Sequence, residues 1–250
     1  MSVRPAFHER YLNPDAELPY GVTADDFRGA IEETYQIYGD ITDYLLEEGH
    51  GRIETLIRAN NALSDLIGNI ATEALADESD ALVHNQKPDG WPDLLPVDYY
   101  DDYVQMYGDE GIETKCSKAS GGWNAHNNEE GWFVIFRYVR GDEDAAPQEM
   151  EPVRFVQVLA AHLEEDDWSH SGRDDESRRT ITSAVQEQGM DKLRSNPVYQ
   201  NPDYISGRAR KKEQFRRIHA RFDPVFADDH PEYATKQVDL TELDGRNTPP

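Results

Sequence analysis

The stretch Gly131-Trp-Phe-Val-Ile-Phe-Arg-Tyr-Val139 decides the fold, because a run so rich in aromatic and β-branched residues is typical of a buried strand. A second run, Val153-Arg-Phe-Val-Gln-Val-Leu-Ala-Ala161, follows after the acidic loop Gly141–Glu151. We therefore expect two long strands at about residues 132–140 and 153–162. They predict a central sheet.

Helices are predicted upstream of these strands. Thr23 is the expected N-cap of a helix that starts at Ala24 and runs to about Glu48, where Gly49 and Gly51 follow. Its apolar residues recur at steps of three and four: Phe27, Ile31, Tyr35, Tyr38, Ile41 and Leu45. The same pattern predicts a second helix over about residues 53–76.

Shorter elements complete the chain. We expect short strands near residues 81–85, 91–95 and 111–117, a helix near 177–193, a loop over 196–207 and a basic helix over 209–222. This order predicts an α/β (mixed α+β) fold, a central mixed sheet flanked by helices. The expected divisions are an extended arm (1–22), one domain (23–195, core about 53–190), a basic helical extension (196–225) and a polar tail (226–250).

The net charge of −25 is the strongest compositional signal: 50 acidic residues face 25 basic ones, and only seven of the basic residues are Lys. Such an acidic, Lys-poor composition resembles that of proteins from extreme halophiles. Molar salt screens self-repulsion there, with a Debye length of about 3 Å at 1 M. The hydrophobic fraction of 37% is low, but the apolar runs exclude disorder for most of the chain.

Cysteine usage and hydropathy exclude several classes of protein. Cys116 is the single cysteine, so the chain forms no internal disulfide and no Cys-rich zinc site. No run of about 18 apolar residues occurs, and no secretory leader pattern is found at the N-terminus. We therefore expect a soluble, cytoplasmic protein with no membrane partner.

Glu113-Thr114-Lys115 is the only acid-x-Lys triplet in the chain. On a strand, its acid and base would share one face, about 7 Å apart. A carboxylate can hold a hard divalent cation that activates water, and an ammonium can position that water for phosphodiester hydrolysis. The second carboxylate is expected from Asp93, in Trp91-Pro-Asp-Leu-Leu95; Asp89, in the turn Lys87-Pro-Asp-Gly90, is the competing choice.

These residues resemble the pattern of the PD-(D/E)xK nuclease superfamily, which includes many restriction endonucleases. The pattern reads Pro92-Asp93 followed by Glu113-Thr114-Lys115, and Glu73 lies on a predicted helix upstream, where the family often carries a Glu. The resemblance covers about residues 53–190 and implies a restriction-endonuclease-like fold.

The resemblance also implies roles and partners. Asp93 and Glu113 would bind Mg²⁺ (or Mn²⁺), with the Thr114 carbonyl as an extra ligand. Lys115 would orient the attacking water, and Glu73 would hold a second ion or shape the first. The implied activity is that of a Mg²⁺-dependent endonuclease acting on double-stranded DNA, as a homodimer, in restriction or defence. The alternatives are a structure-specific repair or recombination nuclease and a non-catalytic DNA-binding protein with the same fold.

The acidic charge, which argues against a DNA partner, is unevenly distributed. Residues 171–222 contain twelve bases and seven acids, a net +5, so the remaining residues carry −30. The candidate DNA-binding residues are Arg208, Arg210, Lys211, Lys212, Arg216, Arg217 and Arg221. A solvated helix that balances an acidic neighbour would show the same composition.

Other interpretations stay open for the remaining candidates. Glu113 and Lys115 would also fit a plain ion pair on an edge strand. Glu73 would also fit a solvated helix position. His126 could contact a phosphate or a base, or could be polar surface, and the Tyr-rich segment 99–107 could stack on bases or simply pack.

Overall fold

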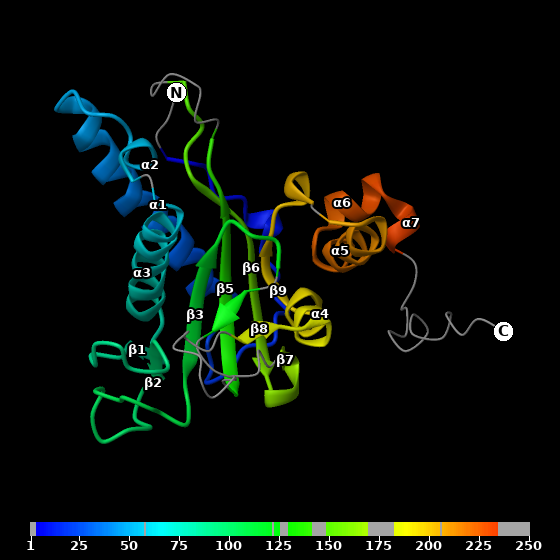
Figure 1. Ribbon diagram of the computed structural model, residues 1–250. Coiled ribbons are helices and arrows are strands. Elements are labelled where there is room, and N and C mark those ends of the chain that lie inside the picture. Colours follow the sequence, from blue (N-terminus) through cyan, green and yellow to red (C-terminus); the bar gives the residue numbers. More distant parts are fainter. Residues whose placement is uncertain are drawn as a thin grey trace, which may run out of the picture.

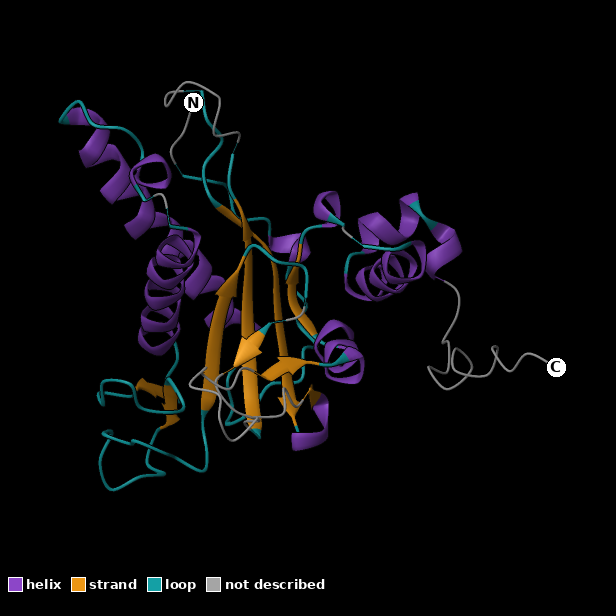
Figure 2. Cartoon of the chain, viewed as in Figure 1, coloured by secondary structure: helices purple, strands orange, loops and turns teal. Residues whose placement is uncertain are grey.

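The structure is a computed structural model that describes residues 4–57, 59–121, 123–125, 130–141, 149–169, 183–205 and 207–234. Its centre is a six-stranded sheet with the order β1-β2-β3-β5-β6-β9 (Figures 1 and 2). The strands are β1 (Leu82–His84), β2 (Leu94–Pro96), β3 (Ile112–Ser117), β5 (Gly131–Val139), β6 (Arg154–Leu163) and β9 (Pro197–Gln200). β3 and β5 are parallel, and the other neighbouring pairs are antiparallel. The expected central mixed sheet flanked by helices is confirmed.

Helices cover one face of this sheet (Figure 1). They are α1 (Ala24–Glu47), α2 (Ile53–Leu56) and α3 (Asn60–Glu78). Thr23 caps α1 as expected: its side chain accepts from Asp26 N–H, and the Asp26 carboxylate accepts from Thr23 N–H. This reciprocal arrangement satisfies N–H groups that the first helical turn leaves unpaired. The apolar stripe of α1 then enters the main core, where Phe27 and Ile31 are fully buried.

The opposite face of the sheet carries a smaller sheet and one helix. They are β4 (Asn124–Ala125), β7 (Trp168–Ser169), β8 (Ser183–Val185) and α4 (Glu187–Ser195), with the strand order β4-β8-β7 and the 3₁₀ turn η2 (Glu165–Asp167) before β7. A second apolar cluster, which includes Phe133, Leu159 and Leu193, fills the space between these layers. Burial on both faces explains why β5 and β6 read as nearly continuous apolar runs.

Strand β3 contributes to both layers. Ile112 and Cys116 lie in the core shared with α1 and α3. Glu113 and Lys115 alternate with them, and their register partners on β5 belong to the second apolar cluster. The acid and the base therefore share one face of the sheet, as strand alternation predicts.

The N-terminal arm follows the far edge of the sheet. Leu12 bridges to Tyr199 of β9, and Asn13 N donates to Val198 O at 2.8 Å. A cluster of helices lies beside this edge (Figure 1). It consists of α5 (Ala209–Phe222), α6 (Pro224–Asp229) and α7 (Pro231–Ala234), and α5 contacts the arm at η1 (Glu9–Tyr11). Within the described residues, no helix is both long and apolar enough to cross a membrane.

Two expected helices have different bounds. The helix predicted over 53–76 is divided into α2 and α3, and the turn of α2 buries an ion pair between Arg52 and Glu54 that a polar sequence pattern does not reveal. The helix predicted over 177–193 is α4, which starts only at Glu187 because residues 183–185 form β8. Residues 170–182 lie outside the described part of the chain.

Two segments expected without regular structure contain elements. The predicted loop 196–207 includes β9 and the 3₁₀ turn η3 (Pro202–Tyr204), and the prolines of the two Asn-Pro pairs are the first residues of these two elements. Val198 and Tyr199 are buried in β9, which pairs with β6. The predicted polar tail from 226 contains most of α6 and all of α7. The Asp223 side chain caps α6 by accepting from Phe226 N–H at 3.0 Å. Residues 235–250 are not described.

Candidate active site

Asp93 directly precedes β2, and β2 brings it against β3. Leu94 pairs with Ile112 in antiparallel register, so Asp93 lies beside the start of the Glu113–Lys115 triplet. Asp93 Oδ2 accepts two hydrogen bonds from Thr114, one from the backbone N–H at 2.9 Å and one from the hydroxyl at 2.8 Å. Two segments 21 residues apart in sequence thus meet at the middle residue of the triplet.

Helix α3 supports this contact from the other side. The Thr72 hydroxyl lies 2.7 Å from Thr114 Oγ1 and 2.9 Å from Gly68 O. Each hydroxyl has one proton, so Thr114 donates its proton to the carboxylate, and the single proton of Thr72 is shared between Gly68 O and Thr114 Oγ1. Helix, strand and carboxylate are therefore connected by one chain of hydrogen bonds.

Glu113 and Lys115 form a direct ion pair through Glu113 Oε1 and the Lys115 ammonium. Only 8% of the Glu113 side chain is exposed, against 31% for Lys115. A buried carboxylate requires a cation nearby, and Lys115 provides one. The pair could serve as a structural link, or it could hold an acid and an ammonium at the edge of a reaction site.

The turn into β3 depends on Gly111, which has a φ of +147°. A Cβ there would collide with Leu94 O and Pro92 Cγ, so only glycine lets the two chain segments approach so closely. The Tyr20 hydroxyl accepts from Gly111 N–H at 2.8 Å and donates to Glu110 Oε2 at 2.7 Å. Burial raises the pKa of Tyr20, so its hydroxyl stays protonated and keeps this role as a donor.

Asn85 fixes the loop that carries Asp93. Its buried side chain donates to Pro92 O at 2.9 Å and Gln105 O at 2.8 Å, and it accepts from Gln105 N–H at 3.0 Å. Its backbone N–H donates to Asp93 O at 2.8 Å. Every polar group of the amide is thus used to hold the backbone around Asp93.

Asp89, the competing choice for the first carboxylate, lies in a tight turn. Gly90 N–H donates to Lys87 O at 2.9 Å, and Asp89 adopts a φ of +57°. The turn expected at 87–90 is confirmed. Asp89 makes no hydrogen bond to the Glu113–Lys115 strand within the described residues, whereas Asp93 makes two.

Glu73 is not brought into contact with Asp93 and Glu113. Its side chain is 63% exposed, and it lies near His84, whose Nε2 is 3.9 Å from Glu73 Oε2. The reason is helical geometry: Thr72 faces Thr114, and the next residue is rotated by about 100° around the helix. Within the described ranges, no three His, Cys, Asp or Glu side chains gather as a metal site.

The oxygen atoms at the junction are of the chemical type that binds a hard divalent cation. Asp93 Oδ1 takes part in no hydrogen bond with the described residues, while Oδ2 is held by Thr114. The carbonyl of Thr114 points to the same strand edge as its N–H, which faces Asp93. The carboxylates of Asp93 and Glu113 and the carbonyl of Thr114 are oxygen donors of the kind that Mg²⁺ prefers, with water completing the coordination.

The seven basic candidates do not all line one cleft. Arg208, Arg210 and Lys211 line one cleft, whereas Arg221 lines a separate hollow. Arg217 pairs with Glu213 at 2.5 Å within α5, and Arg216 lies over the ring of Tyr233. Lys212 is partly exposed near the start of α5. Contact of these residues with DNA phosphates stays a prediction.

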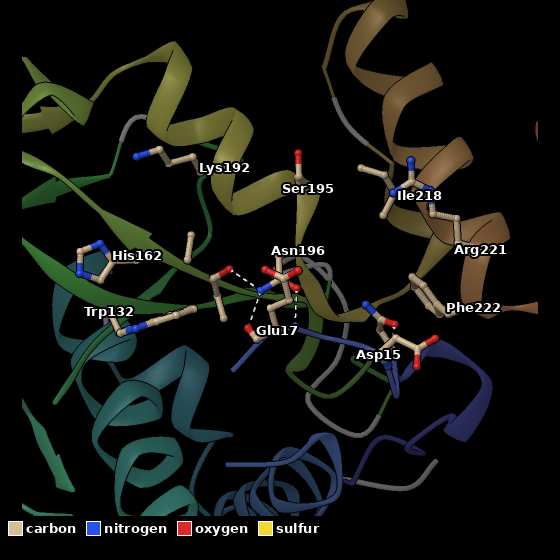
Figure 3. A pocket seen from close by; sticks show the side chains of 13 residues that line it. Asp15, Glu17, Trp132, His162, Lys192, Ser195, Asn196, Ile218, Arg221 and Phe222 are labelled. Atoms are coloured by element: carbon tan, nitrogen blue, oxygen red, sulfur yellow. Dashed lines mark hydrogen bonds between the residues drawn. The ribbon is translucent and has the colours of Figure 1, made fainter. Parts of the chain in front are cut away.

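The hollow with Arg221 has a volume of about 590 Å³ and is bounded by the arm, β5, β6, α4 and α5 (Figure 3). Asn196 reaches from the end of α4 to the arm, where it donates to Glu17 O at 2.7 Å and accepts from Glu17 N–H at 2.9 Å. Lys192 is engaged with Glu164 and Asp167. The polar side chains of the hollow thus serve contacts that hold the fold together. Its lining does not include Asp93, Glu113 or Lys115.

The Tyr-rich segment 99–107 contains both bonded and exposed side chains. The Tyr100 hydroxyl shares its proton between Asp109 Oδ1 at 3.0 Å and Glu110 O at 2.8 Å and accepts from Glu110 N–H at 2.7 Å, which is a structural role. Tyr99 and Tyr107 are exposed, so stacking on bases stays a prediction for them. His126 lies outside the described residues.

Several supporting residues were not identified from the sequence. The junction is contacted from distant segments by Thr72, Asn85 and Tyr20. Such long-range contacts leave no pattern in the local sequence. Gly111 alone carries a usable signal, because a glycine directly before an apolar strand indicates a close backbone approach. Comparison of the chain with protein-family models, with curated proteins and with solved structures gave no match. Function is therefore inferred from the residues and geometry described above.

Proposed function

We propose that this protein is a Mg²⁺-dependent DNA endonuclease that hydrolyses phosphodiester bonds. The observation that carries the proposal is the pair of hydrogen bonds from Thr114 to Asp93. They join the Pro92-Asp93 segment to the Glu113-Thr114-Lys115 triplet across neighbouring strands, as the PD-(D/E)xK pattern requires. Pro-Asp occurs at four places in the chain, and within the described residues only Asp93 makes hydrogen bonds to the triplet.

Each residue of this junction has a chemical role in the proposal. Asp93, Glu113 and the Thr114 carbonyl would hold Mg²⁺, with Mn²⁺ as the alternative. A bound divalent cation supplies Lewis-acid stabilisation of the phosphate and a lowered pKa of water. Lys115 would orient the attacking water, whose oxygen bonds to phosphorus as the bond to a deoxyribose oxygen breaks. The exposed Glu73 is not part of this set.

Within this class we favour a restriction or genome-defence enzyme, acting as a homodimer in the cytoplasm, on the strength of the resemblance. A structure-specific repair or recombination nuclease is the alternative. The products separate the two: discrete plasmid fragments support restriction, while preference for branched or flapped DNA over plasmid supports repair.

A non-catalytic DNA-binding protein is the second candidate, and one observation favours it. The direct ion pair between Glu113 and Lys115 compensates the buried carboxylate without any metal ion. A protein that had kept the fold only for binding would retain this pair as a structural link.

Plasmid cleavage in molar KCl, with Mg²⁺ or with EDTA, tests the proposal. Lys115→Gln removes the ammonium that orients water, and Lys87→Gln is the matched control on the neighbouring loop. We expect Mg²⁺-dependent cutting that Lys115→Gln slows by about 10²–10⁴-fold, the usual contribution of a positioned acid–base group. The control should cut normally.

Two results would count against the proposal. Failure of the unaltered protein to cut plasmid or branched DNA would favour the non-catalytic binding protein. Cutting that survives Lys115→Gln would place the chemistry at another site.

A further inference from the structure

A basic cleft lies on the face of the sheet opposite α1 and α3. It has a volume of about 750 Å³ and is bounded by α4, the start of α5 and the polar ends of β6 and β9. Its lining contains the four cations Arg194, Arg208, Arg210 and Lys211. Glu187 is the single carboxylate among the lining residues, so four cations less one acid give an excess of +3. Such an excess is unexpected in a chain of net charge −25.

The start of α5 adds to the positive potential of this cleft. Its N-cap residue, Arg208, makes no side-chain capping hydrogen bond, and the first turn contains no acid. Arg210 and Lys211 instead place further cations at the positive end of a 14-residue helix. Cations are unfavourable at this end, and a bound anion reverses the penalty.

Arg137 is a buried cation behind the cleft. It is 6% exposed, and no ion pair with a carboxylate is found for it among the described residues. Its guanidinium donates to Gln157 Oε1 at 3.1 Å, and Gln157 Nε2 donates to Gln200 Oε1 at 3.2 Å. Both glutamines line the cleft. Burial lowers the pKa of Arg137, as expected of a desolvated charge that lacks a counterion.

Arg194 is the least exposed of the four cations that line the cleft. Its side chain is 17% exposed, and its closest carboxylate oxygen, on Asp191, is 3.8 Å away. Nη1 is buried and has no hydrogen-bond partner among the described residues. Nη2 makes only a long contact of 3.5 Å with Ser120 O. Because Nη2 makes only this long contact, it keeps donor capacity that a ligand in the cleft could use.

The cleft lies on the same sheet face as the candidate active site. In the parallel pairing of β3 with β5, Lys115 is opposite Ile135, and Ser117 is opposite Arg137. Arg137 thus lies two residues, about 7 Å, along the strand from the position beside Lys115. Hydrogen bonds connect Arg137 through Gln157 and Gln200 to α5, where Gln200 Nε2 donates to Phe215 O at 3.3 Å.

We propose that this cleft binds a phosphate group of the DNA strand, one that is not itself cut, through Arg194 and the first turn of α5. Arg137 acts as a positioning residue, a buried positive charge behind the two glutamines. The inference rests on the proposed nuclease function for its choice of DNA. A phosphate diester matches the cleft because it is anionic and accepts several hydrogen bonds at once.

The test is binding of a short fluorescently labelled DNA duplex to the full chain in molar KCl with EDTA, so that no cleavage is required. Arg194→Gln should raise the Kd by about tenfold, the loss of one charge-assisted hydrogen bond. Arg28→Gln is the matched control, since Arg28 lies on α1 and pairs with Asp25. It should leave the Kd within about twofold.

Arg137→Gln separates positioning from structural support. Replacing a buried, unpaired cation should leave the melting temperature unchanged or higher, while the Kd for the duplex rises. A fall in melting temperature without a change in Kd would assign Arg137 a structural role and overturn its part in the proposal.

The remaining outcomes are distinguishable. Equal Kd values for Arg194→Gln and Arg28→Gln would overturn the proposed site even if the protein cuts DNA. If inorganic phosphate raises the melting temperature but the duplex does not bind, the cleft takes free phosphate and the DNA assignment fails. If the protein binds the duplex through Arg194 but never cleaves DNA, the proposed phosphate site is supported and the nuclease function is rejected.

Discussion

Thr114 holds Asp93 with two hydrogen bonds and receives support from Thr72, so its hydroxyl controls where the carboxylate lies. Thr114→Val keeps the side-chain shape but removes that hydroxyl. We expect a loss of about 1–2 kcal/mol in the free energy of unfolding and about a tenfold lower cleavage rate. Thr34→Val, which removes a buried hydroxyl bonded to Ala30 O in α1, should cost similar stability without slowing cleavage. Equal cleavage by both variants would contradict the role of Thr114.

Gly111 allows β2 to approach β3, and its replacement should disrupt the junction. Gly111→Ala combines a positive φ with a collision against Leu94 O and Pro92 Cγ. Gly21→Ala is a matched control, because Gly21 has a φ of +87° and no atom lies within 4 Å of the place that a Cβ would take. We expect about 1 kcal/mol of destabilisation for the control and more than about 3 kcal/mol for Gly111→Ala, measured by urea unfolding. Similar losses for both variants would show that the close approach is unimportant.

His219 gives a pH-dependent contribution to stability. Burial lowers its pKa to about 4 against its usual 6.5, although the adjacent Asp223, 3.1 Å away, works in the opposite direction. Between these pH values the unfolded chain binds the proton more readily, so stability is full above about pH 6.5 and falls as the pH drops towards 4. The expected loss is about 2–3 kcal/mol.

The His219→Gln variant removes the imidazole, so the difference between the two proteins reports on His219 together with its partner Asp223. Urea unfolding at about pH 7.5 and about pH 4.5, on either side of the titration, should show a steeper loss for the unaltered protein than for the variant. Identical losses would mean that His219 does not carry the effect.

The candidate carboxylates and lysine could be chosen from sequence because they sit in one short pattern. Local sequence is enough to select Asp93, which follows Pro92, and to place Glu113 and Lys115 on one face of a strand. Thr72, Asn85 and Arg137 could not be chosen, since their importance comes from contacts across 20 to 42 residues.

At the scale of elements, α2 depends on the buried ion pair between Arg52 and Glu54, whose side chains are 2% and 0% exposed. Arg52→Met would leave the Glu54 carboxylate buried without its cation. We expect a loss of about 3–5 kcal/mol in the free energy of unfolding. The double variant Arg52→Met with Glu54→Leu should recover most of that loss, since it removes both charges. No recovery in the double variant would show that packing, rather than charge, sets the cost.

The elements that sequence predicts well are long and periodic. α1, β5 and β6 follow the expected bounds within a residue or two, because burial imposes a clear pattern over nine or more residues. β9 is not predicted from the sequence because a four-residue strand that begins with a proline is too short to show a period, and its burial comes from β6 and the arm. The break between α2 and α3 is not predicted, because in the sequence the charged residues Arg52 and Glu54 look like an exposed helix surface rather than a buried ion pair.

At the scale of the whole molecule, the net charge of −25 should make stability depend on salt. Raising KCl from about 0.1 M to about 1 M shortens the Debye length from about 10 Å to about 3 Å and screens repulsion among the acids. We expect the melting temperature to rise by roughly 10 °C, or about 3–5 kcal/mol. Sucrose at equal osmolality is the control, because it acts by exclusion without screening. An equal rise in sucrose, or none in KCl, would contradict an electrostatic origin.

The most direct test of the nuclease site is the dependence of plasmid cleavage on Mg²⁺ concentration, compared between Asp93→Asn and Asp89→Asn in molar KCl. The two variants make the same chemical change four residues apart, one at the junction with Thr114 and one in a turn. Asp93→Asn should abolish cleavage or raise the required Mg²⁺ concentration by at least about tenfold, whereas Asp89→Asn should behave like the unaltered protein. Unchanged Mg²⁺ dependence in Asp93→Asn would contradict a metal site formed by Asp93 and Glu113.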